Sequence, residues 1–196
     1  MEDVMTLSPD FDFGWWNAWI ILVAYYAASF FPFFGGGDKA DARMEGETDL
    51  RDAGAGVRTA AIVDHAILMP LTLLYSFVVP LERGNWWLYS GLIISALAVL
   101  MSLAASISFA TAPVEEPMTA GAYAVSRHPM YLSRVIVFIG VGLAGTSWLF
   151  LLCALVDFVA WSFAVPEEEQ HMIAKYGSHY EDYMRRSRRW IRLPSA

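Results

Sequence analysis

The stretch "YLSRVIVFIGVGLAGTSWLFLLCALVDFVAWSFAV", residues 131–165, decides the fold of this chain. It contains two apolar segments, 131–144 and 148–165, which are separated only by "GTS". So short a connection predicts two antiparallel helices that pack side by side as a hairpin. Gly140 and Gly142 lie in the first segment and Gly145 follows it, and such small residues would let that helix approach a neighbour closely in a membrane.

The composition of the 196-residue chain indicates a membrane protein. Hydrophobic residues make up 57% of it and charged residues only 17%, whereas soluble domains are nearer half apolar and a quarter charged. The beginning, "MEDVMTLSPDFDFGWW", has no basic region, so we expect no secretory signal and expect the first apolar segment to remain in the mature protein. The single Cys153 predicts neither a disulfide framework nor a cysteine metal site.

Further apolar segments are long enough to cross a membrane. A helix needs about 20 mainly apolar residues to span the hydrocarbon layer. We therefore expect spans at residues 14–34, 59–81 and 86–109, with a kink at Pro70 in the second. Together with the hairpin these make an all-α integral membrane bundle of about five transmembrane helices.

Lysine and arginine residues predict the orientation of this bundle. Loop 35–58 carries four of them, turn 82–85 carries one, and the tail from Lys175 carries six of the thirteen. This distribution places the N-terminus outside and the C-terminus in the cytoplasm, in the plasma membrane or, in a prokaryote, the inner membrane. Two regions result, with N-terminal transmembrane helices and a cytoplasmic loop in 1–110 and the helical hairpin with the C-terminal tail in 111–196.

The tail after residue 165 is expected to form amphipathic cytoplasmic helices. Apolar and tyrosine side chains recur there at helical spacing, at Met172, Ile173, Tyr176, Tyr180 and Tyr183. Gly177 should end one helix, and Ser178 with Glu181 has the pattern of a capping box that starts the next. The basic residues of the tail predict contact with anionic lipid.

Polar residues flank the hairpin at both of its open ends. Arg127 and His128 precede the first arm, while Glu167, Glu168 and Glu169 follow the second after a hinge at Pro166. Both ends lie on the cytoplasmic side, so we expect a pocket with cationic donors on one wall and carboxylates on the other. Such a pocket suits a zwitterion, of which S-adenosylmethionine is one. Alternatively, any one of these acids simply stabilises a helix N-terminus.

Asp157 lies inside the second apolar arm, where an ionisable side chain is by default a functional hypothesis. It precedes Glu168 by eleven residues, close to three helical turns, so both share one helix face. A structural ion pair with Arg134 on the other arm is an equally good interpretation. If Arg134 is free, it could instead hold an anionic acceptor.

The remaining ionisable residues give weaker indications of a functional site. Asp64 and His65 stand near the start of the second span and are interpreted as an interfacial pair. His171 and His179 lie on the tail and have no acidic or histidine partner at ligand spacing, so we expect no metal site.

Two motifs resemble those of a known family. "GAYAVSRHPMYLS" (121–133) and "PEEEQHMIAKYGSHYEDYMRR" (166–186) are similar to the paired motifs of the isoprenylcysteine carboxyl methyltransferase and phospholipid methyltransferase group. That group carries G-x-Y-x-x-x-R-H-P-x-Y and then E-E-x-x-L-x-x-x-F-G-x-x-Y-x-x-Y. The resemblance covers residues 121–190 and implies that the C-terminal half binds S-adenosyl-L-methionine near the cytoplasmic face.

The resemblance also implies individual roles. The positions expected to line the cofactor are Met118, Tyr123, His128, Pro129, Met130, Tyr131 and Glu168. Arg127 and Glu169 complete the motifs and are expected to orient the site; with His128, Glu168 and Asp157 they form the predicted catalytic set. Ser133 replaces a glycine that many members have. Ala164 stands where isoprenylcysteine enzymes carry an arginine assigned to the acceptor, which weakens the case for a prenylcysteine carboxylate.

The sequence thus predicts a membrane methyltransferase that uses S-adenosylmethionine. The expected acceptor is a small lipophilic or lipid molecule that reacts through a carboxylate, thiol or amine. One alternative is an N-methyltransferase of phosphatidylethanolamine-like amines, favoured if Asp157 handles the ammonium group. Another is a non-catalytic binding or transport protein that keeps the fold. The expected partners are this acceptor and the bilayer, with no nucleic acid and no metal.

Overall fold

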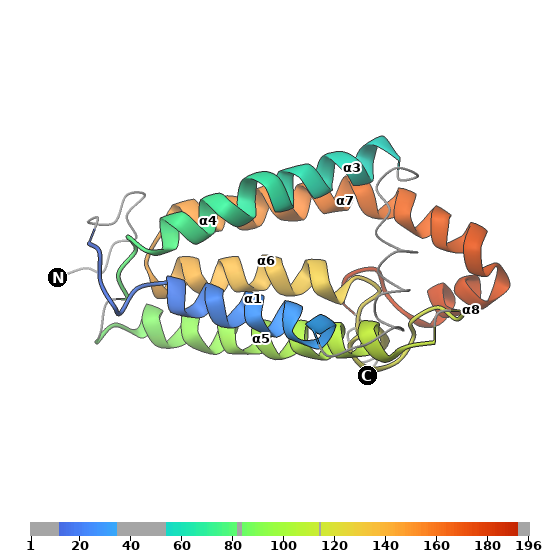
Figure 1. Ribbon diagram of the computed structural model, residues 1–196, viewed down its shortest axis with the longest axis horizontal. Helices are drawn as coiled ribbons and strands as arrows, with labels where there is room; N and C mark the ends of the chain where they lie inside the picture. Colours follow the sequence, from blue (N-terminus) through green and yellow to red (C-terminus); the bar gives the residue numbers. More distant parts are fainter. Residues whose placement is uncertain (1–11, 35–53, 82–83, 114, 192–196) are drawn as a thin grey trace.

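The computed structural model describes residues 12–34, 54–81, 84–113 and 115–191, which form a bundle of antiparallel helices (Figure 1). The helices, in chain order, are α1 (Trp19–Phe34), α3 (Ala55–Ala61), η1 (Ile62–Leu68), α4 (Met69–Ser76), α5 (Trp86–Thr111), η2 (Gly121–Ala124), α6 (Pro129–Ala144), α7 (Trp148–Tyr176) and α8 (Ser178–Arg186). The predicted all-α class is confirmed for this part of the chain.

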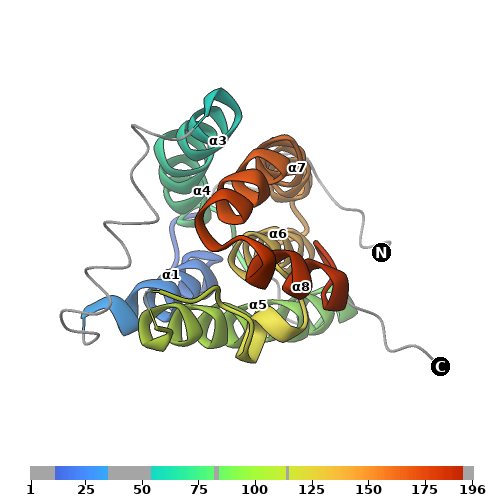
Figure 2. The ribbon, with the colours of Figure 1, turned by 90° about the vertical axis from the view of Figure 1, so that its right-hand side faces the viewer.

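Helix α6 is the centre of the bundle. Figures 1 and 2 show α1 and α5 on one side of it, and α3, α4 and α7 on the other. Its side chains Val137, Phe138 and Val141 are completely buried. The predicted hairpin is confirmed, since α6 and α7 are joined only through Gly145–Ser147 and pack against each other. This central position explains why α6 is apolar on nearly every face.

Three helices among the described residues are long and apolar enough to cross a membrane. They are the continuous helix Ala55–Ser76, α5 and α7. Helices α1 and α6 are apolar but shorter, with 16 residues each. Large apolar side chains cover the outer surface of the bundle, among them Leu74, Leu97 and Phe163. This outer surface suits lipid, and the chain is an integral membrane protein.

Close packing of α5 on α6 depends on glycine. A Cβ built on Gly91 would lie 2.3 Å from the backbone nitrogen of Ala144, and one built on Gly140 would lie 2.8 Å from the backbone nitrogen of Ser95. Real Cβ atoms do not approach backbone atoms so closely. The close approach expected of Gly140 is thus confirmed, and Gly91 provides its counterpart on α5.

The first span begins later than the sequence predicts. Residues 14–18 are not helical, and α1 starts only at Trp19. The buried Asn17 donates a hydrogen bond to the carbonyl of Phe77 (2.7 Å), and the backbone of Ala18 donates to Val79 (2.9 Å). An isolated antiparallel bridge between Asn17 and Pro80 thus joins the segment before α1 to the segment after α4, which ends at Ser76.

The second span contains a π-helical turn, η1, directly before the expected kink at Pro70. Pro70 has no backbone N–H and cannot continue the α-helical hydrogen-bond ladder. The preceding turn is wider, and the backbone of Met69 donates to the carbonyl of Asp64, five residues earlier. The side chain of Asp64 is completely buried within this turn.

Two predictions about the tail are wrong. Pro166 is no hinge, because α7 continues through it to Tyr176; contacts of Glu167 and Glu169 with neighbouring elements hold the turn that follows the proline. Ser178 is no cap, because the N-cap of α8 is Gly177 and it has no side-chain hydrogen bond. The predicted end at Gly177 is confirmed, and its φ of 57° is one that glycine readily adopts.

Exposed aromatic side chains mark one end of the bundle. They lie before α1 and at the first turns of α5 and α7, and they are Trp15, Trp16, Trp86, Tyr89 and Trp148. Tryptophan and tyrosine concentrate where the bilayer meets water. These residues form an aromatic belt at the end of the bundle opposite to α8 (Figure 1).

Candidate functional site

The motif residues of the two hairpin arms meet at the end of the bundle where α6 begins and α7 continues toward α8. Figure 2 looks onto this end. His128 is the N-cap of α6, and Pro129 is its first residue, which suits the fixed φ of proline. Glu168 and Glu169 lie on α7, just beyond its apolar part. The helical hairpin therefore brings residues about forty positions apart in the chain into contact.

The three consecutive glutamates have three different surroundings. Glu167 accepts hydrogen bonds from the backbone of Gly56 (3.1 Å) and Val57 (3.3 Å), so it caps the N-terminus of α3 from outside. Glu168 Oε2 lies 3.6 Å from Nδ1 of His128. Glu169 is buried and accepts hydrogen bonds from two arginines. The alternative that these acids stabilise the start of their own helix is wrong, because they lie inside α7; Glu167 instead caps α3.

His128 lies between two carboxylates. Its Nδ1 faces Glu168, and its Nε2 is 3.4 Å from Oε1 of Glu169. The imidazole is buried, with 4% of its side chain exposed, whereas 24% of the Glu168 side chain is exposed. The ring stacks on Tyr131 with centroids 5.7 Å apart. The imidazole therefore has a carboxylate on each side, and the one of Glu169 lies within hydrogen-bond distance.

Arg127 holds the C-terminal end of the described chain. Its Nε donates to Oε1 of Glu169 (2.8 Å), and its Nη1 donates to the carbonyls of Met184 (3.3 Å) and Ser187 (2.8 Å). Its backbone nitrogen donates to the carbonyl of Arg188 (3.0 Å). The two walls of the predicted pocket therefore contact each other directly at Arg127 and Glu169.

Residues 187–190, which we call the strap, lie across this cluster. Arg189 donates to both oxygens of Glu169, at 3.3 and 2.6 Å. These hydrogen bonds raise the pKa of Arg189 above its ordinary value. The ring of Trp190 packs between Phe158, at 5.2 Å between centroids, and His128, at 6.1 Å. The strap thus covers His128 from outside the helical hairpin.

An aromatic cluster adjoins these charges on the side of α8. Tyr123 and Tyr183 are both buried, and Tyr183 donates a hydrogen bond to the carbonyl of Tyr123 (2.6 Å). Burial raises the pKa of Tyr183 to about 12, so its hydroxyl remains a donor at neutral pH. Burial also raises the pKa of Tyr180. Apolar side chains packed against the cluster include Met118, Met130, Met172 and Ile173.

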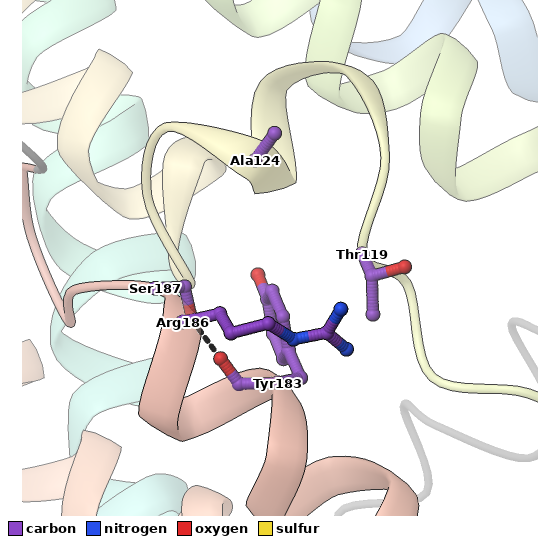
Figure 3. A pocket seen from close by; sticks show the side chains of 5 residues that line it. All are labelled: Thr119, Ala124, Tyr183, Arg186 and Ser187. Carbon is purple, nitrogen blue, oxygen red and sulfur yellow. Dashed lines mark hydrogen bonds between the residues drawn. The ribbon is translucent and has the colours of Figure 1, made fainter.

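A cavity of about 220 Å³ opens beside this cluster (Figure 3). Its lining residues come from the loop before α6 and from the end of α8, and they are Thr119, Ala124, Tyr183, Arg186 and Ser187. Figure 3 shows the Arg186 guanidinium extended across it toward Thr119. The cavity combines one cation, hydroxyl groups and an aromatic wall.

A second set of charges, the charged triad of Asp64, Arg134 and Asp157, lies deeper in the bundle. Arg134 Nε is 3.2 Å from Oδ2 of Asp157, and Arg134 Nη2 contacts Oδ2 of Asp64. Both aspartates are completely buried. The ion pair is one of the two roles that the sequence offers for Asp157. Arg134 is not free, so the condition for its binding an anionic acceptor is not met here.

Stacked rings connect the triad with the motif residues. Tyr131 stacks on Trp161 with centroids 3.6 Å apart, and the Arg134 guanidinium lies 5.8 Å from the Trp161 ring centroid. Tyr131 also stacks on His128. The predicted site residues therefore occupy one continuous region, although Asp157 is separated from the carboxylates of Glu168 and Glu169 by these rings.

Sequence reasoning missed three residues of this region. Asp64 is assigned to an interfacial pair; it does lie 3.3 Å from Nδ1 of His65, but it also faces Arg134. A charged residue within each of three apolar segments was the signal that could have linked them. Arg189 and Trp190 offered no comparable signal, because a basic tail predicts lipid contact equally well. In the described part of the chain no cluster suits a metal ion.

Residues 89–179 match the model of the phospholipid methyltransferase family. The matched segment runs from the first turn of α5 to the start of α8 and contains the motif residues of both hairpin arms. The resemblance recognised in the two motifs is confirmed over this segment. No curated protein matches the chain.

Proposed function

Since residues 89–179 match the model of the phospholipid methyltransferase family, we propose that this chain transfers a methyl group from S-adenosyl-L-methionine to a lipophilic or lipid acceptor at the cytoplasmic membrane face. The observation that supports it most strongly is the position of His128 between Glu168 and Glu169. This polar cluster lies at the open end of an apolar hairpin. A water-soluble donor and a membrane acceptor can both approach that position.

The residues present fit this cofactor. Its amino-acid moiety carries a carboxylate and an ammonium group, which suit His128 and the partly exposed Glu168 respectively. Its adenine suits the aromatic and methionine side chains around Tyr123 and Met130. Arg127 and Glu169 already bind each other and the strap, so we assign them to orienting His128.

The protein contributes mainly by positioning the two reactants and by excluding water from them, and less by covalent chemistry. When bound, S-adenosylmethionine supplies an electrophilic methyl group on a sulfonium. Holding two reactants in line can contribute ~7–11 kcal/mol to lowering a barrier. Tyr131 and Trp161 form an apolar wall next to His128, which excludes water and strengthens the polar contacts that remain.

A phospholipid amine is the acceptor that we favour over a prenylcysteine carboxylate. The matched family is one of phospholipid methyltransferases. Ala164, where isoprenylcysteine enzymes have an arginine, is completely buried between Ala60 and Trp161 and leaves no cation in that place. An amine must lose a proton before it attacks, so acidic residues near the site are also consistent with this acceptor.

We further propose five crossings, with α1 and α6 completing the three longer spans. The antiparallel course of these helices places the starts of α3 and α6 and the end of α7 at one end of the bundle (Figure 1). The basic residues of loop 35–58 and of the tail favour a cytoplasmic location for this end. The division into regions 1–110 and 111–196 is part of the same proposal.

Titration of the detergent-purified protein with S-adenosylmethionine tests the donor site. We expect micromolar binding, weakened at least about tenfold, or by about 1.4 kcal/mol, in His128→Ala and Glu168→Gln. His179→Ala and Glu181→Gln change exposed residues of α8 and should leave binding unchanged. A folded preparation that binds no S-adenosylmethionine would contradict every enzymatic version of the proposal.

Incubation with methyl-labelled cofactor and total membrane lipid then tests turnover. Label in an aminophospholipid fraction supports the amine acceptor, whereas label in a thiol or carboxylate compound corrects the acceptor and retains the reaction. Binding of the cofactor without label transfer to any of these classes would favour the non-catalytic alternative.

A further inference from the structure

The imidazole assigned to the donor is closed off in this structure. Only 4% of the His128 side chain is exposed, although the proposed methyl transfer requires it to contact the carboxylate of a water-soluble cofactor. The ring of Trp190 packs beside it from outside the helical hairpin, at 6.1 Å between centroids. The cofactor can therefore reach His128 only after a neighbouring group has moved.

The cavity beside this cluster is small for such a cofactor. Its volume is about 220 Å³, whereas pockets that bury drug-sized ligands measure about 300–1,000 Å³. Its lining residues do not include His128. They do include Ser187, the first residue of the strap, whose carbonyl accepts a hydrogen bond from Arg127 at 2.8 Å (Figure 3). The strap thus contacts both the cavity and the motif residues, so its displacement would extend the cavity toward them.

The strap is the neighbouring element best able to move. Residues 187–190 form neither helix nor strand and follow the end of α8. Their backbone carbonyls are held by single hydrogen bonds, from the backbone of Arg127 to Arg188 (3.0 Å) and from the hydroxyl of Ser126 to Arg189 (3.2 Å). A peripheral segment with few contacts opens at a lower free energy than helices packed in the centre of a bundle.

The contact of Arg189 with Glu169 is the strongest that holds the strap. The guanidinium donates to both carboxylate oxygens, at 3.3 and 2.6 Å, and such charge-assisted pairs are stronger than neutral hydrogen bonds. The Arg189 side chain is 40% exposed, so water can replace Glu169 as its partner when the strap moves. Glu169 keeps its hydrogen bond from Arg127 (2.8 Å). Opening of the strap therefore leaves neither charge without a partner.

From these observations we propose that the strap is a gate of the donor site. S-adenosylmethionine reaches and leaves His128 only while Arg189 is released from Glu169 and Trp190 has moved away. The gate closes in the same way over the empty and the occupied site, and over the occupied site it excludes water from the reacting groups. This inference rests on the proposed methyl transfer and adds the control of access to it.

Chemical modification of histidine tests the gate without any cofactor. The full-length protein in a neutral detergent is treated with diethyl pyrocarbonate, which reacts with accessible imidazole nitrogens, and peptide mass spectrometry gives the rate at each histidine. In Arg189→Ala we expect His128 to react at least about fivefold faster, because loss of the charge-assisted pair increases the open fraction. His179, exposed on α8, should react at an unchanged rate. An unchanged rate at His128 would overturn the gate.

Arg188→Ala is the matched control variant. It removes the same charge from the adjacent position of the strap, but the Arg188 side chain is exposed and makes no hydrogen bond or ion pair with the residues that the structure describes. Its backbone carbonyl, which binds Arg127, is retained. We expect no change in the rate at His128. Equal acceleration by the two arginine variants would contradict the role of the contact with Glu169.

The rates of cofactor exchange distinguish a gate from an ordinary binding contact. Labelled S-adenosylmethionine is released from the protein by a chase with unlabelled cofactor, and titration gives Kd. Arg189→Ala should raise the dissociation and association rates at least about fivefold each and leave Kd within about twofold, since a barrier common to entry and exit does not shift the equilibrium. Faster dissociation with a proportional loss of affinity would show that the strap contributes only to the bound state, and would contradict the gate.

Trp190→Ala provides a second variant if Arg189→Ala does not fold. It removes the ring that covers His128 and retains the contact of Arg189 with Glu169, and it should likewise accelerate both directions of exchange. The two kinds of measurement separate the proposals. Faster modification of His128 in a protein that binds no S-adenosylmethionine would retain the moving strap and refute the donor. Cofactor binding with unchanged rates and reactivity in every variant would retain the donor and refute the gate.

Discussion

At the scale of single residues, three adjacent glutamates on α7 serve different neighbours. A step of one residue along a helix rotates a side chain by about 100°, so Glu167, Glu168 and Glu169 must face different directions. They meet the N-terminus of α3, the imidazole of His128 and the guanidinium groups of the strap and motif, respectively. One acidic run therefore combines a helix cap, a candidate ligand contact and a buried ion pair.

Replacing Glu167 should lower the stability of the protein without changing its affinity for the ligand. Glu167→Ala removes the acceptor for the first N–H groups of α3, and we expect a loss of about 1 kcal/mol in the free energy of unfolding. S-adenosylmethionine affinity should be unchanged, because this carboxylate does not face His128. Denaturant titration and ligand titration of one preparation measure both quantities. An affinity loss as large as that of Glu168→Gln would show that the two residues act together.

At the scale of elements, the hairpin is held from both sides by different chemistry. Small residues let α5 approach α6, while α3 and η1 reach the hairpin through charges, by way of Glu167 and Asp64. Hydrophobic attraction between helices is weak in lipid, because the surrounding tails are equally apolar. Close backbone packing and buried polar contacts take its place.

A single methyl group at the contact of α5 and α6 tests this packing. Gly91→Ala places a Cβ within 2.4 Å of backbone atoms of α6, which cannot move independently of that helix. We expect a loss of about 2 kcal/mol in the free energy of unfolding. Ala96→Val adds a larger group on the exposed face of α5 and should change it by less than about 0.5 kcal/mol. Equal effects of the two substitutions would contradict the close approach.

At the scale of the whole molecule, the polar site and the aromatic belt lie at opposite ends of the bundle. The belt includes Trp15 and Trp86, whereas the strap, α8 and the hairpin mouth lie at the other end (Figure 1). The distance between the ends corresponds to helices of up to 29 residues. This arrangement is consistent with the proposed methyl transfer at one face of a bilayer.

The proposed orientation is testable by labelling. In a Cys153→Ala background, single cysteines at Gly84 and at His179 are exposed at opposite ends of the bundle. A membrane-impermeant maleimide applied to intact cells should label the first and leave the second unlabelled until the membrane is permeabilised. The proposed topology places an odd number of crossings between residues 84 and 179, so the two cysteines should lie on opposite sides of the membrane. Labelling of both in intact cells would contradict this topology.

Much of this architecture was predictable because it depends on local pattern. Long apolar runs predict membrane helices, and the three-residue link predicts the hairpin, since neither conclusion needs distant contacts. The motif at Arg127 and His128 and the acids after Pro166 were recognisable for the same reason. Where local signals were weighed alone they failed: Pro166 predicts a hinge, yet α7 continues through it, and two of the glutamates that follow bind other elements.

By itself the sequence determined that the chain is a membrane protein, that it contains a helical hairpin, and which charged residues stand at the mouth of that hairpin. Only the tertiary structure decided how those charges are paired: Asp64 with Arg134, Glu167 with the start of α3, and Arg189 with Glu169. Helix formation and membrane insertion depend on neighbours along the chain. The partner of a buried charge depends on which helices lie side by side, and that is a property of the whole packed bundle.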